Sequence, residues 1–584
     1  MGLEVDKRDV NELVEEQSQE LTTEELHDLH SQQHTVVQRK ISSEEKPEME
    51  EVISTRDIKE ILEMWEKVVE FVDKNHPEKV ATGRASELFN ETCLTHFRNI
   101  LKGRKKQTSL DSFFKRSAKI IFRIFPVISN VLTGLSTLFP NEKVACINIL
   151  GYKLTFFLHP ESAKEVLRSN SLINKSSSYD FFKPIFGHNS ILYSSDDNWR
   201  RRRKYLAPHF HLWNLKDYRN VFMEHSNVLV DKLKQLQENE IFNVLEWMKS
   251  CTLDIIADIA IGVSLHSQTT NDQEYVSAIH RILKYFPEWL LNSMYWFPPI
   301  FLMSKMKKNF KRDAEIIHRF DEKVFKRKKE NFVKEMQEQH SLDKDARHEE
   351  EPKTKTKQRL IDSLLDLHVK QSLMSKEDVI RDMEGFIFAG YDTTAHAMSW
   401  TLYFLGRFHN IQEKLYLELQ EIFENDMNRD ITIDDLTKMT YLECVIKESM
   451  RIYPPVLFIA RKNPSKMKIG NYVLPAHSTL VINIYGIHHN PSVYENPEVF
   501  DPDRFLPENY KKLHPYAFLP FSAGPRNCIG GKLAMIEMKI VLANVLRNFK
   551  VYSLDPQDKI VTSAEVLLTP ISGIRMFVEK RCIS

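Results

Sequence analysis

The 584-residue sequence has no excess of charge of either sign, because 81 Lys and Arg residues balance 81 Asp and Glu residues. A chain without net charge has no global field that would attract nucleic acid or an anionic membrane, so any such partner needs a local basic patch. Cysteine is also sparse: six are scattered along the chain without a CxxC pair. This pattern fits a reducing compartment better than a disulfide framework, and it leaves a cysteine available as a working thiolate.

We also expect neither a secretory leader nor a membrane-spanning segment in this sequence. Its first residues, MGLEVDKRDVNELVEEQ, place acids where a signal peptide has a cationic start and an apolar run. The most apolar early stretch contains Lys119, Arg123 and Pro126, whereas a spanning helix needs roughly 20 predominantly apolar residues. We therefore expect residues 117–138 to be an amphipathic entry segment, which either contacts a membrane surface or packs as an ordinary helix on the core.

Composition divides the rest of the chain. Residues 1–54 are acidic and polar with almost no aromatic side chains, so we expect a disordered tail. Residues 55–116 carry apolar residues at helical spacing, and long helical patterns dominate residues 139–584. Strand-like runs are confined to three places: residues 147–157, residues 466–484 and the end of the chain. A charged segment from about His340 to Gln358 is expected to link two helices. The sequence therefore predicts a mainly α domain with a small β-rich part, preceded by a partly disordered helical extension.

Residues 521–531 read FSAGPRNCIGG and contain Cys528. A lone cysteine is most often a buried, inert side chain. Here, however, Gly524 and Pro525 favour a tight turn before the sulfur, and an apolar-striped helical pattern, LAMIEMKIVLANVL, follows it. A thiolate at a helix start is stabilised by the helix dipole and by backbone N–H groups, which suits metal ligation.

This loop resembles the haem-binding loop of cytochromes P-450, Phe-x-x-Gly-x-Arg-x-Cys-x-Gly. The fixed positions are matched by Phe521, Gly524, Arg526, Cys528 and Gly530. The resemblance implies the cytochrome P-450 fold, a haem b (iron protoporphyrin IX) with Cys528 as its axial thiolate, and monooxygenase activity. In that family the thiolate pushes electron density onto iron and favours O–O cleavage.

Two further motifs resemble the Glu–Arg–Arg core of the same family, which holds the fold together behind the haem. KESMR places Glu448 and Arg451 three residues apart on a predicted helix, and FDPDRF supplies Arg504. Taken alone, such a pair is usually a solvated surface pair worth at most about 1 kcal/mol. With Cys528 nearby in the sequence, the resemblance implies a structural role.

The segment GFIFAGYDTT lies inside a helical pattern that runs from about Lys376 to Phe408. Gly390 and the threonines after it are poor helix formers, so we expect them to loosen or kink the helix. Taken alone, the segment could be a bend without chemistry. The resemblance implies that Thr393 is the hydroxyl on the oxygen side and Asp392 its acid partner, and that the two relay protons through water toward dioxygen.

The basic segment NWRRRRKYLAPHFH places Trp199 and Arg203 one helical turn apart, after the plausible helix start SSDD. Taken alone, it could be a solvated helix or a nucleic-acid contact. The resemblance assigns Trp199 and Arg203 to a haem propionate, with Arg526 and Arg461 as further candidates. The remaining cations are expected to form a positive face for an acidic electron-donor flavoprotein; they are Arg200, Arg201, Arg202 and Lys204.

Several stretches, including IKESMRIYPPVLFIARK, resemble the microsomal fatty-acid hydroxylases of clan four. The resemblance implies a lipophilic substrate (fatty acid, terpenoid, hormone-like or xenobiotic) bordered by Phe386, Phe388 and Ala389. It also implies electrons from NADPH through NADPH–cytochrome P-450 reductase, with cytochrome b5 as a second donor, and the cytosolic face of the endoplasmic reticulum membrane. No spanning anchor is visible in the sequence. Ala389 stands where many members carry the Glu that bonds to haem, which predicts a non-covalent porphyrin.

Two rival functions stay open at this point. A P-450-like isomerase or dehydratase would rearrange a peroxide without external electrons, but it would not need a proton relay such as Asp392 and Thr393. The second rival rests on residues 55–116, which resemble the tail of Tigger/pogo-class transposases. There, QTSLDSFF places Gln107, Leu110, Phe113 and Phe114 in a pattern that binds the sliding clamp of DNA replication. The alternative is that this segment is a vestigial fusion.

Overall fold

The computed structural model describes residues 142–149, 152–210, 212–270, 274–291, 295, 298–345, 359–424, 426–470, 472–564 and 566–581. The predicted segments 1–54, 55–116 and 117–138 lie outside these residues. So do Gln107, Leu110, Phe113 and Phe114 of the clamp-like motif. These predictions therefore stay predictions.

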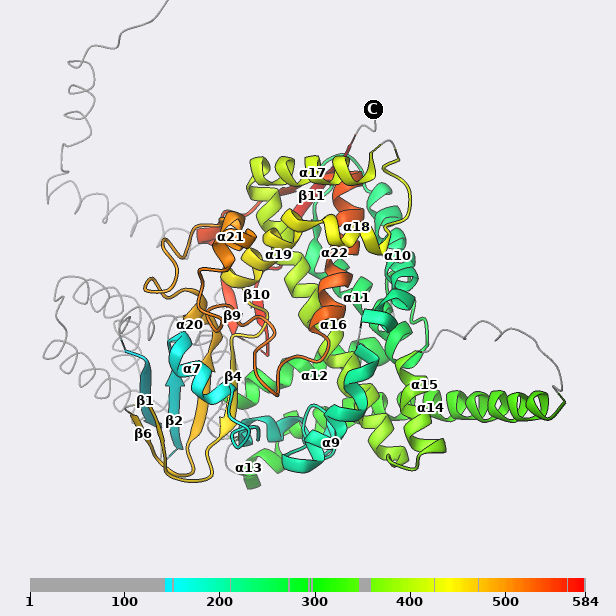
Figure 1. Cartoon of the computed structure of the whole chain (residues 1–584), viewed down its shortest axis with the longest axis vertical. Helices are drawn as coiled ribbons and strands as arrows, with labels where there is room; N and C mark the ends of the chain where they lie inside the picture. The colour runs from blue at the N-terminus through cyan, green and yellow to red at the C-terminus, as the bar shows by residue number, and fades with distance from the viewer. Residues whose placement is uncertain are drawn as a thin grey trace, which may run out of the picture. The chain divides into compact units, whose positions relative to one another are not determined.

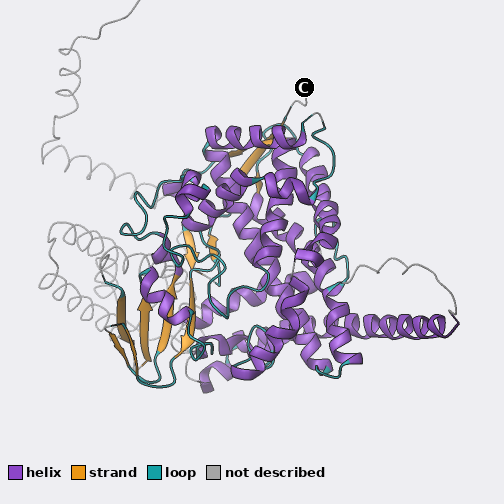
Figure 2. Cartoon of the chain, viewed as in Figure 1, coloured by secondary structure: helices purple, strands orange, loops and turns teal. Residues whose placement is uncertain are grey.

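Helices dominate the described residues, as the sequence predicts. The helices are α7 (Pro160–Leu167), α8 (Lys183–Phe186), α9 (Asp196–Leu206), α10 (Leu212–Lys234), α11 (Val244–Ile261), α12 (Glu274–Leu291), α13 (Pro298–Met303), α14 (Lys305–Asp345), α15 (Leu360–Leu365), α16 (Lys376–Arg407), α17 (His409–Phe423), α18 (Ile433–Lys438), α19 (Thr440–Ile452), α20 (Ile484–His488), α21 (Pro507–Tyr510) and α22 (Gly531–Asn548). Figure 2 shows these helices in purple, with most strands gathered beside them in a small β-rich part.

The largest sheet among the described residues has the strand order β1-β2-β7-β4. Its strands are β1 (Val144–Ile149), β2 (Tyr152–Phe157), β7 (Thr479–Asn483) and β4 (Phe458–Lys462). Strands β2 and β7 are parallel, and the two outer pairs are antiparallel. A three-stranded sheet has the order β3 (Phe242–Asn243), β11 (Arg575–Lys580) and β8 (Phe549–Ser553). Two strand pairs are also present: β5 (Met467–Ile469) with β6 (Tyr472–Leu474), and β9 (Thr562–Ala564) with β10 (Leu568–Pro570). The sequence analysis missed β4, because its basic residues interrupt the apolar pattern.

Helix α16 lies in the middle of the helical part, between α11 and α22 (Figure 1). It begins with a capping box: the Ser375 hydroxyl accepts from the Asp378 N–H at 3.1 Å, and the Asp378 carboxylate accepts from the Ser375 N–H at 3.3 Å. Two N–H groups that have no partner inside the helix are thereby satisfied. This capped N-terminus helps to explain how one helix can extend through the whole core.

The close packing of α16 against α11 explains Gly390. A Cβ atom at this position would lie 2.7 Å from Cγ1 of Ile256 on α11, which is too close for any side chain. One residue further on, the carbonyl of Tyr391 accepts a hydrogen bond from the Thr252 hydroxyl of α11 at 2.8 Å. Helix α16 is continuous through Gly390, and the loosening or kink predicted from the sequence stays a prediction. The glycine lets the two helices pack closely.

The charged segment after α14 begins later than predicted. Helix α14 continues to Asp345, so the first residues of the expected linker are helical, and residues 346–358 lie outside the described part. Lys, Glu and Gln are good helix formers, which allows a helix to continue into a highly charged segment.

Two buried clusters form the core of the described residues. The larger one joins α10, α11, α16, α17, α19 and α22 and includes Trp400 and Phe404 of α16. The smaller one lies between α7 and the β-rich part and includes Phe157 of β2. Among the described helices, none combines the length and the apolar character needed to cross a bilayer.

Candidate functional site

Cys528 lies in a tight loop just before α22, as the sequence predicts. Its N–H donates to the Phe521 carbonyl at 2.9 Å, and the Asn527 N–H donates to the Gly524 carbonyl at 3.1 Å. Gly524 has a positive φ of 74°, and a Cβ there would lie 1.8 Å from the carbonyl oxygen of Leu167. Only glycine fits this position, so the turn that presents the sulfur depends on it.

Hydrogen-bond donors surround the Cys528 sulfur. The backbone N–H groups of Gly530 and Gly531 are directed at it, and the Arg203 guanidinium is close enough to stabilise a negative charge there. Burial nevertheless raises the pKa of the thiol, because these groups offset only part of the cost of desolvating a thiolate. The residue is still exposed to solvent, so the sulfur is reachable although protein surrounds it. A coordinated metal ion would deprotonate such a thiol outright.

Cationic side chains gather beside this loop. Arg526 lies over the ring of Trp199, 5.0 Å from its centroid, and donates to the carbonyls of Ile173 and Ser194 at 2.7 and 2.6 Å. Arg203 donates to the backbone and side-chain oxygens of Asn527 at 3.0 and 2.7 Å. The structure therefore brings Trp199, Arg203 and Arg526 together around the cysteine loop.

Arg461 and Lys175 complete a group that we call the cation cluster (Lys175, Arg203, Arg461 and Arg526). Lys175 pairs with Arg461 through a β-bridge. Burial, and then Arg526 and Arg461, lower the pKa of Lys175 well below its usual range. Burial and the neighbouring Arg461 lower the pKa of Arg526 to about 9. Like charges crowd one another here, and each weakens the charged form of its neighbour.

Within the described part of the chain, none of the four cations forms an ion pair with a carboxylate. Uncompensated charges in a buried setting are costly, so such a cluster points to an anionic group that completes it. Guanidinium groups hold carboxylates particularly well, because two N–H donors can face two oxygens. The residues present therefore fit a cofactor that offers carboxylates to the cations and a metal ion to the sulfur, as haem does.

The prediction of the positive face is wrong for one residue, Arg202. Arg202 is 6% exposed and forms ion pairs with Asp382 and Asp378, both at 2.6 Å. It ties α9 to α16 and does not reach the surface. The prediction treated four consecutive cations alike, whereas the helical period turns Arg202 toward the core on the same side as Trp199. Arg200, Arg201 and Lys204 are exposed.

Helix α16 is accessible at one place in its buried length. From Asp382 to Gly406 every residue is buried except Ala389, Gly390 and Thr393. The Thr393 hydroxyl donates to the Ala389 carbonyl at 2.7 Å, a back-bond typical of threonine in helices. The motif predicted to face oxygen is thus the only described stretch in this part of α16 that a small molecule can reach. Phe386 and Phe388, expected to border the substrate, are instead buried against Phe210 and Phe186.

Asp392 is buried next to this accessible stretch and is held by a lysine and a histidine. Lys249 of α11 lies 3.3 Å from its carboxylate, and Nδ1 of His396 lies 3.4 Å away. Nδ1 also contacts the Asp392 carbonyl at 2.7 Å, so this ring nitrogen carries a proton. Burial alone would raise the pKa of Asp392, but His396 and Lys249 more than offset it and lower the pKa well below its usual range. The group is therefore a carboxylate at neutral pH.

Glu448, Arg451 and Arg504 form one buried group, which excludes the solvated-pair interpretation. Arg451 donates two hydrogen bonds to the Glu448 carboxylate, at 2.7 and 2.8 Å, and both side chains are fully buried. Arg504 lies 3.5 Å from the same carboxylate, and the Asp501 N–H donates to it at 3.0 Å. A third Arg451 nitrogen donates to the His488 carbonyl at 2.9 Å.

Sequence reasoning missed three residues of the site: Lys175, Lys249 and His396. His396 follows Asp392 by four residues, so the helical period alone could have identified it. Lys175 and Lys249 reach their partners from segments that are distant in the sequence, and no local pattern distinguishes them from surface lysines.

Comparisons with known proteins agree with this geometry. A family model described as Cytochrome P450 matches residues 139–577. Cytochrome P450 4c3 of Drosophila melanogaster is 36% identical over 429 residues, which cover 72% of this chain and 79% of that protein. Cytochrome P450 4V2 of Homo sapiens is 35% identical over 422 residues, again 72% and 79%.

A solved structure, the cytochrome P450DA heme domain, has a similar fold. The TM-score is 0.66 over 78% of this chain and 93% of that chain, at 21% sequence identity. At this identity the likeness concerns the fold alone.

Proposed function

The chain belongs to the cytochrome P450 family of monooxygenases, and we propose that it inserts one oxygen atom from O2 into a lipophilic substrate, with electrons from NADPH. One observation carries the proposal: an accessible cysteine before α22 lies beside a cation cluster that has no carboxylate partners among the described residues. A haem-thiolate site needs both features, one for the iron and one for the porphyrin carboxylates.

In this proposal Cys528 is the axial thiolate of haem b, and the cation cluster and Trp199 hold the propionates. Phe521, Gly524 and Gly530 shape the loop that presents the sulfur. Bound haem supplies the redox chemistry that activates O2, and a thiolate ligand favours O–O cleavage. The protein supplies the ligand, the orientation and the charge balance. Because Ala389 has no carboxylate, the porphyrin is held without a covalent bond.

Thr393 and Asp392 handle the protons. The Asp392 carboxylate, kept ionised by Lys249 and His396, can accept hydrogen bonds from the water through which protons move, and so orient it. The Thr393 hydroxyl lies one residue further along, on the accessible stretch of α16, and can orient that water once it turns away from the Ala389 carbonyl. General acid–base steps of this kind contribute about 10²–10⁴-fold to rates.

The electron donor is proposed to bind the exposed cations of α9. Arg200, Arg201 and Lys204 are exposed on the helix whose Arg203 contacts the cysteine loop. An acidic surface would be steered to these charges. NADPH–cytochrome P-450 reductase is the proposed partner, with cytochrome b5 as a second donor.

The substrate is proposed to be a fatty acid or another lipophilic molecule such as a terpenoid, hormone-like compound or xenobiotic. The support is the similarity to clan-four proteins and the small, apolar Ala389 on the accessible stretch of α16. We further propose the cytosolic face of the endoplasmic reticulum membrane as the location, with residues 117–138 as the membrane-contact segment. Residues 1–54 and 55–116 would then be a tail and a separate helical segment preceding the haem domain, 139–584.

The full-length chain, NADPH, a P-450 reductase and a panel of saturated fatty acids test this function. We expect hydroxylated product that carries one atom of isotopically labelled O2. Thr393→Ala should still consume NADPH. It should, however, release more of the electrons as hydrogen peroxide, because the hydroxyl that orients the proton-carrying water is gone. Conversion of a fatty-acid hydroperoxide without NADPH, at a rate that Thr393→Ala does not change, would instead support the isomerase class.

A further inference from the structure

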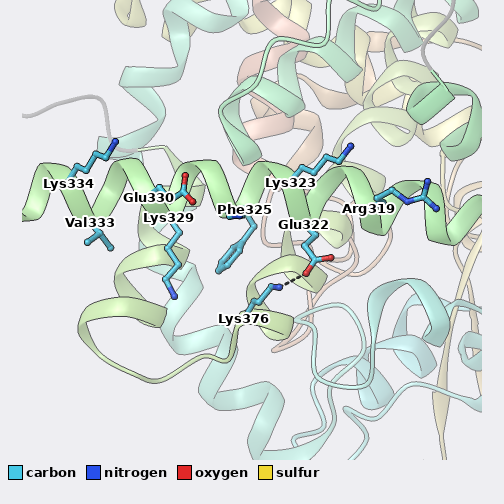
Figure 3. Close-up of a pocket in the computed structure, with 10 residues that line it drawn as sticks. Arg319, Glu322, Lys323, Phe325, Lys329, Glu330, Val333, Lys334 and Lys376 are labelled. Carbon is cyan, nitrogen blue, oxygen red and sulfur yellow. Dashed lines mark hydrogen bonds and ion pairs between the residues drawn. The ribbon is translucent and has the colours of Figure 1, made fainter.

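A groove with a volume of about 750 Å³ runs along α14, outside the cofactor site. Six of its ten lining residues are cations, and only two are acidic. The cations are Arg319, Lys323, Lys326, Lys329, Lys334 and Lys376. Five belong to α14, and Lys376 approaches from the first turn of α16 (Figure 3). None of them belongs to the cation cluster or to the proton-handling residues.

Most of this charge is uncompensated within the described residues. Lys376 forms an ion pair with Glu322, whereas no ion pair joins the other five cations to a carboxylate of the described part. Arg319, Lys323 and Lys326 follow one another at spacings of four and three residues, so their charges are neighbours on the helix surface. Glu322 and Glu330 stand at helical spacing from Arg319, Lys326 and Lys334, which offsets part of the repulsion among the cations. Six cations against two acids still leave an excess of four positive charges in the lining, which an anionic partner would offset.

The groove also has an apolar floor. Phe325 is 3% exposed and Val333 is half-buried. Figure 3 shows both side chains, with Lys329 between them, pointing to the side of α14 from which Lys376 approaches. The Lys329 ammonium contacts Nε2 of His368 at 3.1 Å. A ligand that lies here meets apolar surface at the bottom and ammonium groups along the edges.

We propose that this groove binds an acidic peptide segment of a partner protein, with one or two apolar side chains over Phe325 and Val333. From Arg319 to Lys334 the helix extends roughly 22 Å at 1.5 Å per residue, which matches about seven residues of extended chain. A polyphosphate or sulfated polymer would gain nothing from the apolar floor. A membrane surface could not reach it, because Phe325 is recessed and does not project.

The binding test uses the full-length chain and a fluorescein-labelled peptide in which glutamates flank two leucines. Fluorescence anisotropy at low salt measures the affinity. The groove variant Lys323→Glu/Lys326→Glu should weaken binding by about tenfold or more, since it reverses two positive charges of the groove lining. The matched control Lys305→Glu/Lys308→Glu makes the same charge change on exposed positions of the same helix outside the groove, and it should change the affinity less than about twofold.

Two further probes test the ligand class. A peptide with serine in place of both leucines should bind several-fold more weakly, and the difference should shrink in Val333→Ser, because the apolar floor is then lost. Equal weakening by the groove and control variants would overturn the proposal in favour of a general charge effect. Tighter binding of inositol hexakisphosphate, or of vesicles rich in phosphatidylserine, with the same sensitivity to Lys323→Glu/Lys326→Glu would overturn the choice of an acidic peptide.

Discussion

Two groups of charges in this molecule are balanced in different ways. One is centred on the fully buried Glu448 and Arg451, and the other is the cation cluster, in which Arg461 is buried and the other three cations are half-buried. In the group around Glu448, one carboxylate receives hydrogen bonds from Arg451 and the Asp501 N–H and has Arg504 nearby, all from the protein itself. In the cation cluster, Arg526 and Arg461 have only carbonyl oxygens as acceptors among the described residues, and Lys175 lies beside them. The first group is complete, whereas the second lacks its counter-charge.

The difference separates a structural role from a binding role. A buried ion pair that the protein completes fixes the fold, and losing one partner leaves the other desolvated and unpaired. A desolvated cluster of one sign carries a cost that a ligand of the opposite sign offsets. The partners of a charged group, rather than its burial or its residue types, therefore indicate whether the group binds a cofactor.

The largest expected effect comes from breaking the complete group. Arg451→Leu leaves the Glu448 carboxylate buried with its main partner gone, which should cost about 3–5 kcal/mol of folding free energy. Loss of soluble, haem-containing protein and a large drop in the thermal unfolding midpoint would show this. The control is Lys447→Leu on the same helix, where the pair with Glu443 is partly exposed and should contribute no more than about 1 kcal/mol. Similar midpoints for the two variants would contradict a complete, structural group.

A second variant addresses Asp392, which is fully paired like the first group but lies next to the accessible stretch of α16. Asp392→Asn removes the negative charge that orients the proton-carrying water, so product formation should fall about 100-fold. Lys249→Met should act more mildly, because it raises the pKa of Asp392 without removing the carboxylate. The readout is the pH profile of turnover: loss of Lys249 should move its acidic limb to higher pH. An unchanged profile would mean that Asp392 is purely structural.

The Arg429–Asp435 pair extends the comparison to a pair that is partly exposed. Burial alone would raise the pKa of Asp435, but hydrogen bonds from Arg429 and Thr432 more than offset it and lower the pKa to about 2. A depressed folded pKa contributes stability above the unfolded value of 3.8, and this contribution is lost as the pH falls toward about 2. Asp435→Asn should therefore cost roughly 2 kcal/mol at neutral pH. The cost, measured by denaturant unfolding, should shrink as the pH is lowered through this window.

The smallest effect is expected in the incomplete group, and it should depend on the cofactor. Arg526→Gln removes a repelling charge, so the haem-free protein should keep its stability or gain slightly. The haem-bound form should lose a charge-assisted hydrogen bond, with about tenfold faster haem loss. Transfer of haem to an acceptor protein measures this loss. Equal destabilisation of both forms would place Arg526 with the structural charges.

Much of the site could be predicted because its motifs are local. The loop from Phe521 to Gly530 needs a glycine turn, a cation and a cysteine within ten residues, and Asp392 and Thr393 are adjacent in one helix. The mainly α fold with a small β part was also predicted correctly, because helical periodicity extends over long stretches.

What could not be predicted depends on tertiary contacts. Lys175 and Lys249 acquire their roles from Arg461 of β4 and Asp392 of α16, which lie 286 and 143 residues away in the sequence but are adjacent in the structure. Arg202 was placed on the surface because four cations in a row conceal the helical period. The packing reason for Gly390 could not be predicted either, because the side chain that requires a glycine there, Ile256, belongs to another helix.

The most direct test of the central claim is a reduced carbon-monoxide difference spectrum of the full-length chain beside Cys528→Ser. Thiolate ligation predicts a strongly red-shifted Soret band that is lost in this variant. The control Cys444→Ser changes a buried cysteine outside the loop, and it should keep the band. Absence of bound haem, or the same band with and without the Cys528 sulfur, would contradict the account.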